Sequence, residues 1–365
     1  MDMMTGDMLR SLVQEQVGIC VSMYMPTIQK GTETQQNQIR YKNLLRKAEE
    51  YLMTRDLRPS EIRDLMSPAQ ELLGDVPFWK NQKNGLAMFI SPNIFEYYRI
   101  PQRFEELVVV SDRFHLKPLI PILGNMIDLY ILAISQNSVR LFECTQYTVT
   151  DRELEGVPQN IDEALNLDTY QKRLQLHTGS EDTKANILQY FKIVDRGLKD
   201  ILRDKKVPLI FAGVDYLYPL YKEANTYPYL ADTAIAGNPE DLSGDELLEQ
   251  ARPIINSLLE KKRMDAIALY KQNAGTGLAS DDLQEIVAAA CHGRSGVLFI
   301  TVDKQQWGTF DPATSKVYLS EFERPGYEDL LDLAAIQTHL NGGTVYSINP
   351  TEMPVTTSLA AIFRY

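Results

Sequence analysis

The residues best suited to chemistry in the first third of the chain are cations on one predicted helix. Arg40 and Lys47 lie seven residues apart and share a helix face, whereas Lys42 and Arg46 share a flank. Such cations can pair with the phosphate oxygens of RNA, and Asn37 near the helix start can meet a base in a single strand. The alternative is a solvated helix face, partly neutralised by neighbouring glutamates. The sequence leaves both readings open.

Familiar catalytic and metal-binding motifs are absent. The chain has no G-x-x-x-x-G-K-[ST] loop, no G-x-S-x-G elbow and no H-x-x-x-H pair. Its cysteines, Cys20, Cys144 and Cys291, lie far apart without C-x-x-C spacing, which indicates free thiols in mostly apolar surroundings. We therefore expect no metal site and no cofactor.

The helix that carries the cations is predicted over about 34–53. Its apolar stripe of Tyr41, Leu45, Ala48 and Leu52 has the spacing of one helix face. A second helix should begin at the Pro-Ser-Glu of residues 59–61 and end at a glycine suited to a C-cap, Gly74. Three short β runs follow, over 85–91, 95–100 and 106–111.

The rest of the chain alternates strands and helices, which predicts an α/β fold with mixed sheets covered by helices. The middle third has strands over 128–135, 139–145, 148–154 and 207–213, with a helix over about 183–203. The last third follows a turn at 237–239 and has helices over about 243–272, 280–290 and 327–340 between strands at 296–302, 316–320, 343–348 and 360–365. We expect three domains, over 1–124, 125–238 and 239–365, each with a mixed sheet and helices.

Composition limits the partners and the location of the protein. The length of 365 residues fits two or three domains. A net charge of −12 weighs against a general polyanion binder, so DNA is not an expected partner. Acidic residues outnumber basic ones most strongly over 239–365, which suits a protein partner. The sequence begins without a signal-peptide pattern and lacks an apolar run long enough for a membrane span, which predicts a cytoplasmic protein without a membrane partner.

Several short sequence segments, in the same order along nearly the whole chain, resemble segments of archaeal and eukaryotic peptide-chain release factors. The most specific are NGLAMFIS at 84–91 and the closing AAIFRY at 360–365, supported by VSMYMPT at 21–27, VVVSDRFHLKPL at 108–119 and LIFAGVDYL at 209–217. The chain is most similar to the bacterial archaeo-eukaryotic release factor-like family, within the superfamily of class 1 release factors and Pelota. This resemblance implies a release-factor-like N-terminal domain, a ribonuclease H-like middle domain and a C-terminal α/β/α sandwich.

The resemblance also points to a catalytic loop, with a departure. Classical members hydrolyse the peptidyl-tRNA ester with a Gly-Gly-Gln loop in the second domain, and this chain lacks that motif. The corresponding stretch, 171–183, holds Gln175, His177 and Gly179 instead. A glutamine or a neutral imidazole can order or deprotonate a water, and a glycine lets the backbone approach a substrate. The alternative is a mobile polar loop without chemistry.

The resemblance implies a protein that acts on ribosomes or tRNA in the rescue of stalled translation. If it is an enzyme, it is an esterase on peptidyl-tRNA, with Lys172 and Arg173 beside the loop as further RNA contacts. Stop-codon reading is not expected, because residues 37–42 match the family's Asn-Ile-Lys-Ser motif only in part. The alternative is a non-catalytic adaptor that binds tRNA or the ribosome, or a scaffold for a protein partner. In either case the acidic residues 239–365 are a candidate dock for a translational GTPase.

Overall fold

The computed structural model divides the chain into two compact units. Unit 1 combines Met1–Gly124 with Ala266–Tyr365, and unit 2 is Asn125–Asp265. The structure describes residues 11–13, 18–29, 34–55, 57–124, 127–135, 137–145, 148–165, 180–301, 303–322, 324 and 326–365.

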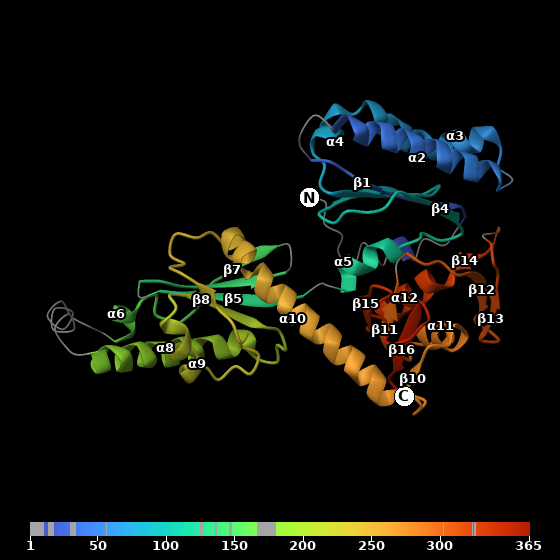
Figure 1. Cartoon of the computed structure of the whole chain (residues 1–365). Helices are drawn as coiled ribbons and strands as arrows, with labels where there is room; N and C mark the ends of the chain where they lie inside the picture. Colours follow the sequence, from blue (N-terminus) through green and yellow to red (C-terminus); the bar gives the residue numbers. More distant parts are fainter. Residues whose placement is uncertain are drawn as a thin grey trace. The chain divides into compact units, whose positions relative to one another are not determined.

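The N-terminal part of unit 1 is an antiparallel sheet covered on one face by two helices (Figure 1). The strand order is β3-β2-β1-β4, and every neighbouring pair is antiparallel, whereas the sequence predicted a mixed sheet. The short turn between β2 and β3 reverses the chain and so makes that pair antiparallel. The elements are β1 (Cys20–Pro26), α2 (Gln35–Met53), α3 (Pro59–Glu71), α4 (Val76–Lys80), β2 (Gly85–Ile90), β3 (Phe95–Ile100), β4 (Leu107–Ser111) and α5 (Ile120–Gly124).

Helix α2 forms where its apolar stripe predicted it and packs that stripe on the sheet. Tyr41, Leu45, Ala48 and Leu52 are all buried in one core with β1, β2 and β4. The Tyr41 hydroxyl donates a hydrogen bond of 2.7 Å to the carbonyl oxygen of Ala69 on α3. This bond satisfies the buried hydroxyl and ties the two helices together.

The C-terminal part of unit 1 is the α/β/α sandwich that the sequence predicted. Its mixed sheet has the order β10-β16-β11-β15, with β11 and β15 parallel and the other pairs antiparallel. Helices α11 and α12 pack near β11, and the end of α10 packs against Phe299 and Ile362. A small sheet, β13-β12-β14, is attached. The elements are β10 (Ala279–Ser280), α11 (Leu283–Cys291), β11 (Ser295–Ile300), β12 (Trp307–Asp311), β13 (Lys316–Leu319), β14 (Glu328–Asp329), α12 (Leu330–Leu340), β15 (Thr344–Ser347) and β16 (Leu359–Phe363).

A buried ion pair joins the two parts of unit 1. The ammonium of Lys117, which is fully buried, donates to Asp329 Oδ2 at 2.5 Å and to the carbonyl oxygen of Lys304. Asp329 also caps α12, since its Oδ1 accepts from the backbone N–H groups of Gln306 and Leu331. The stretch before α5 is thus fastened to the start of α12.

Two further titratable groups lie against this pair. Asp332 Oδ1 accepts from the backbone N–H groups of Leu116 and Lys117 and lies 3.9 Å from His115 Nδ1. Burial, together with the nearby charge of Asp329, raises the pKa of Asp332 to about 8, and Lys117 opposes this shift. Burial also lowers the pKa of His115 to about 4. The charged forms of both groups are disfavoured because water is excluded.

Unit 2 is a five-stranded mixed sheet with helices packed on both faces (Figure 1). Its order is β7-β6-β5-β8-β9, with β5, β8 and β9 parallel to one another. Alternate residues of β5 face α8 and α9 on one side and α10 on the other. The elements are β5 (Leu129–Ile134), β6 (Val139–Cys144), β7 (Val149–Arg152), α6 (Ile161–Ala164), α8 (Ser180–Leu202), β8 (Leu209–Gly213), α9 (Leu217–Ala224), β9 (Ile235–Ala236) and α10 (Gly244–Asn273).

The long helix α10 contributes to cores in both units. Leu247 and Ile255 pack in the core of unit 2, whereas Ile267 and Tyr270 pack in that of unit 1. The boundary between the two units therefore falls inside this helix, at 265/266. The predicted α/β fold is confirmed. The division into three domains stays a prediction, since the first and last thirds form one unit.

Candidate functional site

The predicted RNA-binding side of α2 is only partly exposed. Asn37 is fully buried, and its side-chain amide pairs with the backbone of Ile28. Asn37 Oδ1 accepts from Ile28 N at 3.0 Å, and Asn37 Nδ2 donates to the Ile28 carbonyl oxygen at 2.9 Å. Asn37 therefore holds the chain that enters α2 and presents no surface to a base. Its place four residues before Tyr41, on the apolar stripe, was the signal for burial.

Arg40 is also committed to an internal contact. Its side chain is about a quarter exposed, and its Nε lies 3.5 Å from Glu106 Oε1, beside β4. Arg40 thus helps to fix α2 to the sheet, and it is less available to phosphate than its predicted place on the same helix face as Lys47 suggested. The seven-residue spacing predicted that Arg40 and Lys47 share a helix face. The acidic partner of Arg40, Glu106, lies 66 residues later in the sequence, so no local pattern predicts this contact.

Lys42, Arg46 and Lys47 form the exposed cationic side of α2. Arg46 is 75% exposed and makes only a weak pair with Glu50, at 3.7 Å between Nε and Oε1. The Lys47 ammonium lies 5.6 Å from the centre of the Tyr51 ring. Within the described residues no ion pair involves Lys42. These three cations, which we call the α2 basic side, can contact phosphate without first breaking a strong internal bond.

The predicted catalytic loop lies outside the described residues. Gln175, His177 and Gly179, with Lys172 and Arg173 beside them, all precede α8, which begins at residue 180. Their assignment stays a prediction.

The described residues show neither a metal-ligand cluster nor a reactive thiol. No group of three or more His, Cys, Asp or Glu side chains among the described residues is placed to hold a metal ion. Burial raises the pKa of the Cys144 and Cys291 thiols to about 12, so both are protonated at neutral pH and unsuited to nucleophilic attack. Within the described helices, no segment is long and apolar enough to cross a membrane.

Comparison with known families identifies the central part of the chain. Residues 129–294 match the family model of the bacterial archaeo-eukaryotic release factor family 3. The match runs from β5 through α11 and so includes all the described secondary structure of unit 2. The resemblance that the sequence predicted is thereby confirmed. No curated protein matches the chain.

Solved structures of release-factor-like proteins resemble the chain at low identity. An archaeal translation termination factor, aRF1, is 17% identical, with 98% of this chain and 96% of that chain covered, at a TM-score of 0.26. Ribosome-bound archaeal Pelota, in a structure with ABCE1, is 13% identical, with 100% and 95% covered, at 0.41. Dom34 of S. cerevisiae, described as interacting with Hbs1, is 12% identical, with 74% and 73% covered, at 0.35. These scores are too low for whole-chain superposition, so the functional argument rests on the family match.

Proposed function

We propose that the protein acts on ribosomes or tRNA in the rescue of stalled translation, because residues 129–294 match a release factor family. The family match carries this proposal. The α2 basic side supports it, since it offers cations to phosphate on an otherwise acidic protein. Stop-codon reading is not part of the proposal, because Asn37 is buried and the stop-codon motif is absent.

The binding half of the proposal is tested by co-sedimentation with ribosomes over a range of salt concentrations. The α2 basic side is replaced by alanine at Lys42, Arg46 and Lys47 together. If all three contact phosphate, the slope of log affinity against log salt falls by about 2 to 3. A matched control replaces three exposed lysines of α10 by alanine, Lys261, Lys262 and Lys271. Equal losses for both triple variants would show that only overall charge matters.

The catalytic half concerns the loop before α8. We propose that Gln175 or His177 orients a water toward the peptidyl-tRNA ester, while Gly179 lets the backbone approach. Release of labelled peptide from stalled ribosomes should then fall at least about tenfold in Gln175→Ala/His177→Ala, since general acid–base groups contribute about 10²–10⁴-fold. Gln159→Ala, an exposed glutamine before α6, is the control. Undiminished release by the double variant would remove the catalytic assignment.

A non-catalytic adaptor is the second candidate, and the absence of Gly-Gly-Gln favours it. In this case the protein occupies ribosomes or tRNA without releasing peptide. A translational GTPase is the proposed partner of residues 239–365. That region exposes three large apolar side chains on β13 and just after it, namely Tyr318, Leu319 and Phe322. Such exposed apolar groups are typical of protein contacts.

The adaptor is tested by pull-down with a purified translational GTPase. Replacing Tyr318, Leu319 and Phe322 by serine should abolish capture and leave ribosome binding intact. Tyr216→Ser, an equally exposed tyrosine in unit 2, is the control. Retained capture by the triple-serine variant would place the GTPase contact elsewhere.

A further inference from the structure

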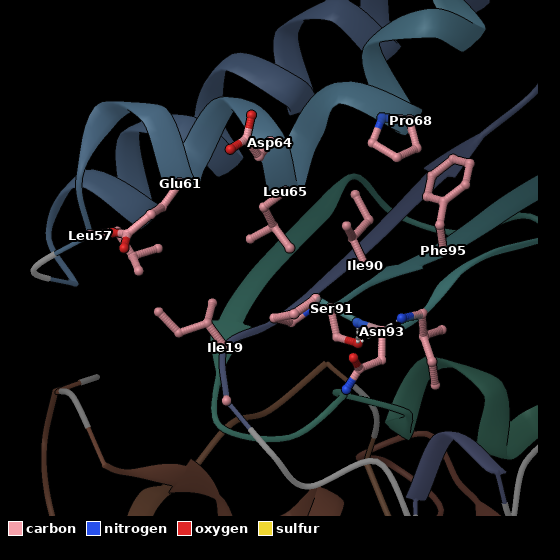
Figure 2. Close-up of a pocket in the computed structure, with 13 residues that line it drawn as sticks. Ile19, Leu57, Glu61, Asp64, Leu65, Pro68, Ile90, Ser91, Asn93 and Phe95 are labelled. Atoms are coloured by element: carbon pink, nitrogen blue, oxygen red, sulfur yellow. Dashed lines mark hydrogen bonds between the residues drawn. The ribbon is translucent and has the colours of Figure 1, made fainter.

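A cavity of about 690 Å³ lies between α3 and the sheet of unit 1 (Figure 2). One wall is formed by Leu57, just before α3, and by the side of α3 that carries Leu65 and Pro68. The facing wall is formed by residues 18–19 ahead of β1 and by 90–95, which span the end of β2, the turn and the start of β3. We call this cavity the α3 hollow. Its volume is in the range of ligand-binding pockets.

The hollow exists because α3 packs its buried side against α2 and not against β3. Ile62, Met66 and Ala69 are buried in the shared core. Leu57 and Leu65 lie on the side toward the hollow and are only half-buried. Figure 2 shows these side chains across a gap from the strand ends. The walls are therefore the edge of the core, and an apolar group placed there would gain contact without displacing packed residues.

The charged residues that line the hollow are both acidic. Glu61 and Asp64 lie on α3, and both are exposed. Glu61 accepts from the backbone N–H of Arg58 at 2.8 Å, so it also caps α3. Two carboxylates beside an apolar cavity, without a lining cation, disfavour phosphate and favour a positive charge. The α3 hollow is thus unsuited to the RNA that the α2 basic side would contact.

We propose that the α3 hollow binds a short basic segment of a protein partner, which inserts one apolar side chain between α3 and the β2–β3 turn. Lysine or arginine residues beside that side chain pair with Glu61 and Asp64. The carboxylates are exposed at the rim, whereas the walls at Leu65 and Ile90 are apolar. Apolar and cationic groups must therefore sit apart on the ligand, as they do along a peptide. The inference does not depend on the proposed function.

The test uses fluorescence anisotropy with a labelled ten-residue peptide that contains leucine flanked by lysines. We expect binding, and a loss of affinity of about 3- to 30-fold in Glu61→Gln/Asp64→Asn, because exposed ion pairs contribute little individually. Glutamine keeps an acceptor for the cap of α3. The control is Glu153→Gln/Glu155→Gln, which removes two exposed charges from unit 2 and should change the affinity less than about twofold.

The apolar half of the contact has its own variant and probes. Leu65→Trp fills the hollow and should weaken the peptide at least as much as loss of the carboxylates, with folding checked by circular dichroism. Peptides with leucine replaced by serine, or lysines by glutamate, should bind at least tenfold more weakly. The proposal is overturned if the leucine–lysine peptide does not bind at 1 mM. A dissociation constant of this size corresponds to a binding free energy of about −4 kcal/mol. The proposal is equally overturned if hexylamine or a ten-nucleotide RNA displaces the peptide at equal concentration.

Discussion

The buried pair of Lys117 and Asp329 should be the most sensitive point of unit 1. Removing one partner of a buried ion pair costs about 3–5 kcal/mol, because the other charge is left unpaired. In Asp329→Asn the buried ammonium keeps only the carbonyl of Lys304, so we expect a cost of about 4–5 kcal/mol. In Lys117→Met the carboxylate keeps two backbone N–H donors, from Gln306 and Leu331, so about 3 kcal/mol is expected.

The double variant separates the pair interaction from simple loss of packing. Lys117→Met/Asp329→Asn removes both charges, keeps an unbranched side chain at 117 and keeps an acceptor for the α12 cap. It should cost about 2 kcal/mol or less, below either single variant, since neutral replacement of a buried pair is often tolerated. The coupling energy between the two sites should then exceed about 3 kcal/mol.

Urea unfolding followed by tryptophan fluorescence is the suitable assay. Both tryptophans of the chain, Trp79 and Trp307, lie in unit 1, so the signal reports that unit. Arg46→Met, which removes an exposed cation of the same unit, is the control and should change stability by no more than about 0.5 kcal/mol. Additive costs in the double variant, or single costs below about 1 kcal/mol, would refute the reasoning.

Three further predictions concern pH, RNA contact and the chain entering α2. Because the pKa of Asp332 is raised to about 8 from 3.8, the folded carboxyl keeps a proton that the unfolded chain has lost, and stability falls as pH rises toward 8. Relative to wild type, Asp332→Asn should gain about 1.4 kcal/mol per pH unit between about pH 5 and 7 in urea titrations, and a constant difference would contradict the shift. Replacing Lys42, Arg46 and Lys47 by glutamate should weaken ribosome binding in co-sedimentation more than replacing them by alanine, because the carboxylates repel phosphate. Equal losses for the two triple variants would show that the α2 basic side faces solvent in the complex. Asn37→Ala should cost about 1–3 kcal/mol in urea unfolding, because the two partly buried backbone groups of Ile28 lose their partners, with unchanged stability as the contrary result.

Local sequence signals predicted most elements of unit 1 correctly. The predicted helix at 34–53 is observed as Gln35–Met53, and the helix that begins at residue 59 ends, through one 3-10 turn, at Gly74. Apolar periodicity, a proline at the helix start and a glycine at its end are features of contiguous residues. They need no knowledge of distant partners, which is why they could be read from the sequence.

The roles of single polar side chains were harder to predict, because they depend on residues far along the chain. The sequence around Lys117 has no local pattern that predicts burial, yet its cation is buried against Asp329, 212 residues later. Arg40 reads as a surface cation and instead contacts Glu106. The α3 hollow is likewise a consequence of how α3 sits over the sheet, which no local pattern encodes.

The charge distribution of the chain constrains how any RNA contact must work. A net charge of −12 repels a polyanion at long range, so attraction must come from cations that reach phosphate within a screening length of about 8–10 Å. The α2 basic side meets this condition, since its cations are exposed and weakly paired. A basic protein segment has the opposite balance, because both the whole chain and the carboxylates of the α3 hollow attract it. Adjacent helices of one hairpin therefore offer surfaces of opposite preference, one for phosphate and one for cations, so an RNA and a basic protein segment would not compete for the same surface.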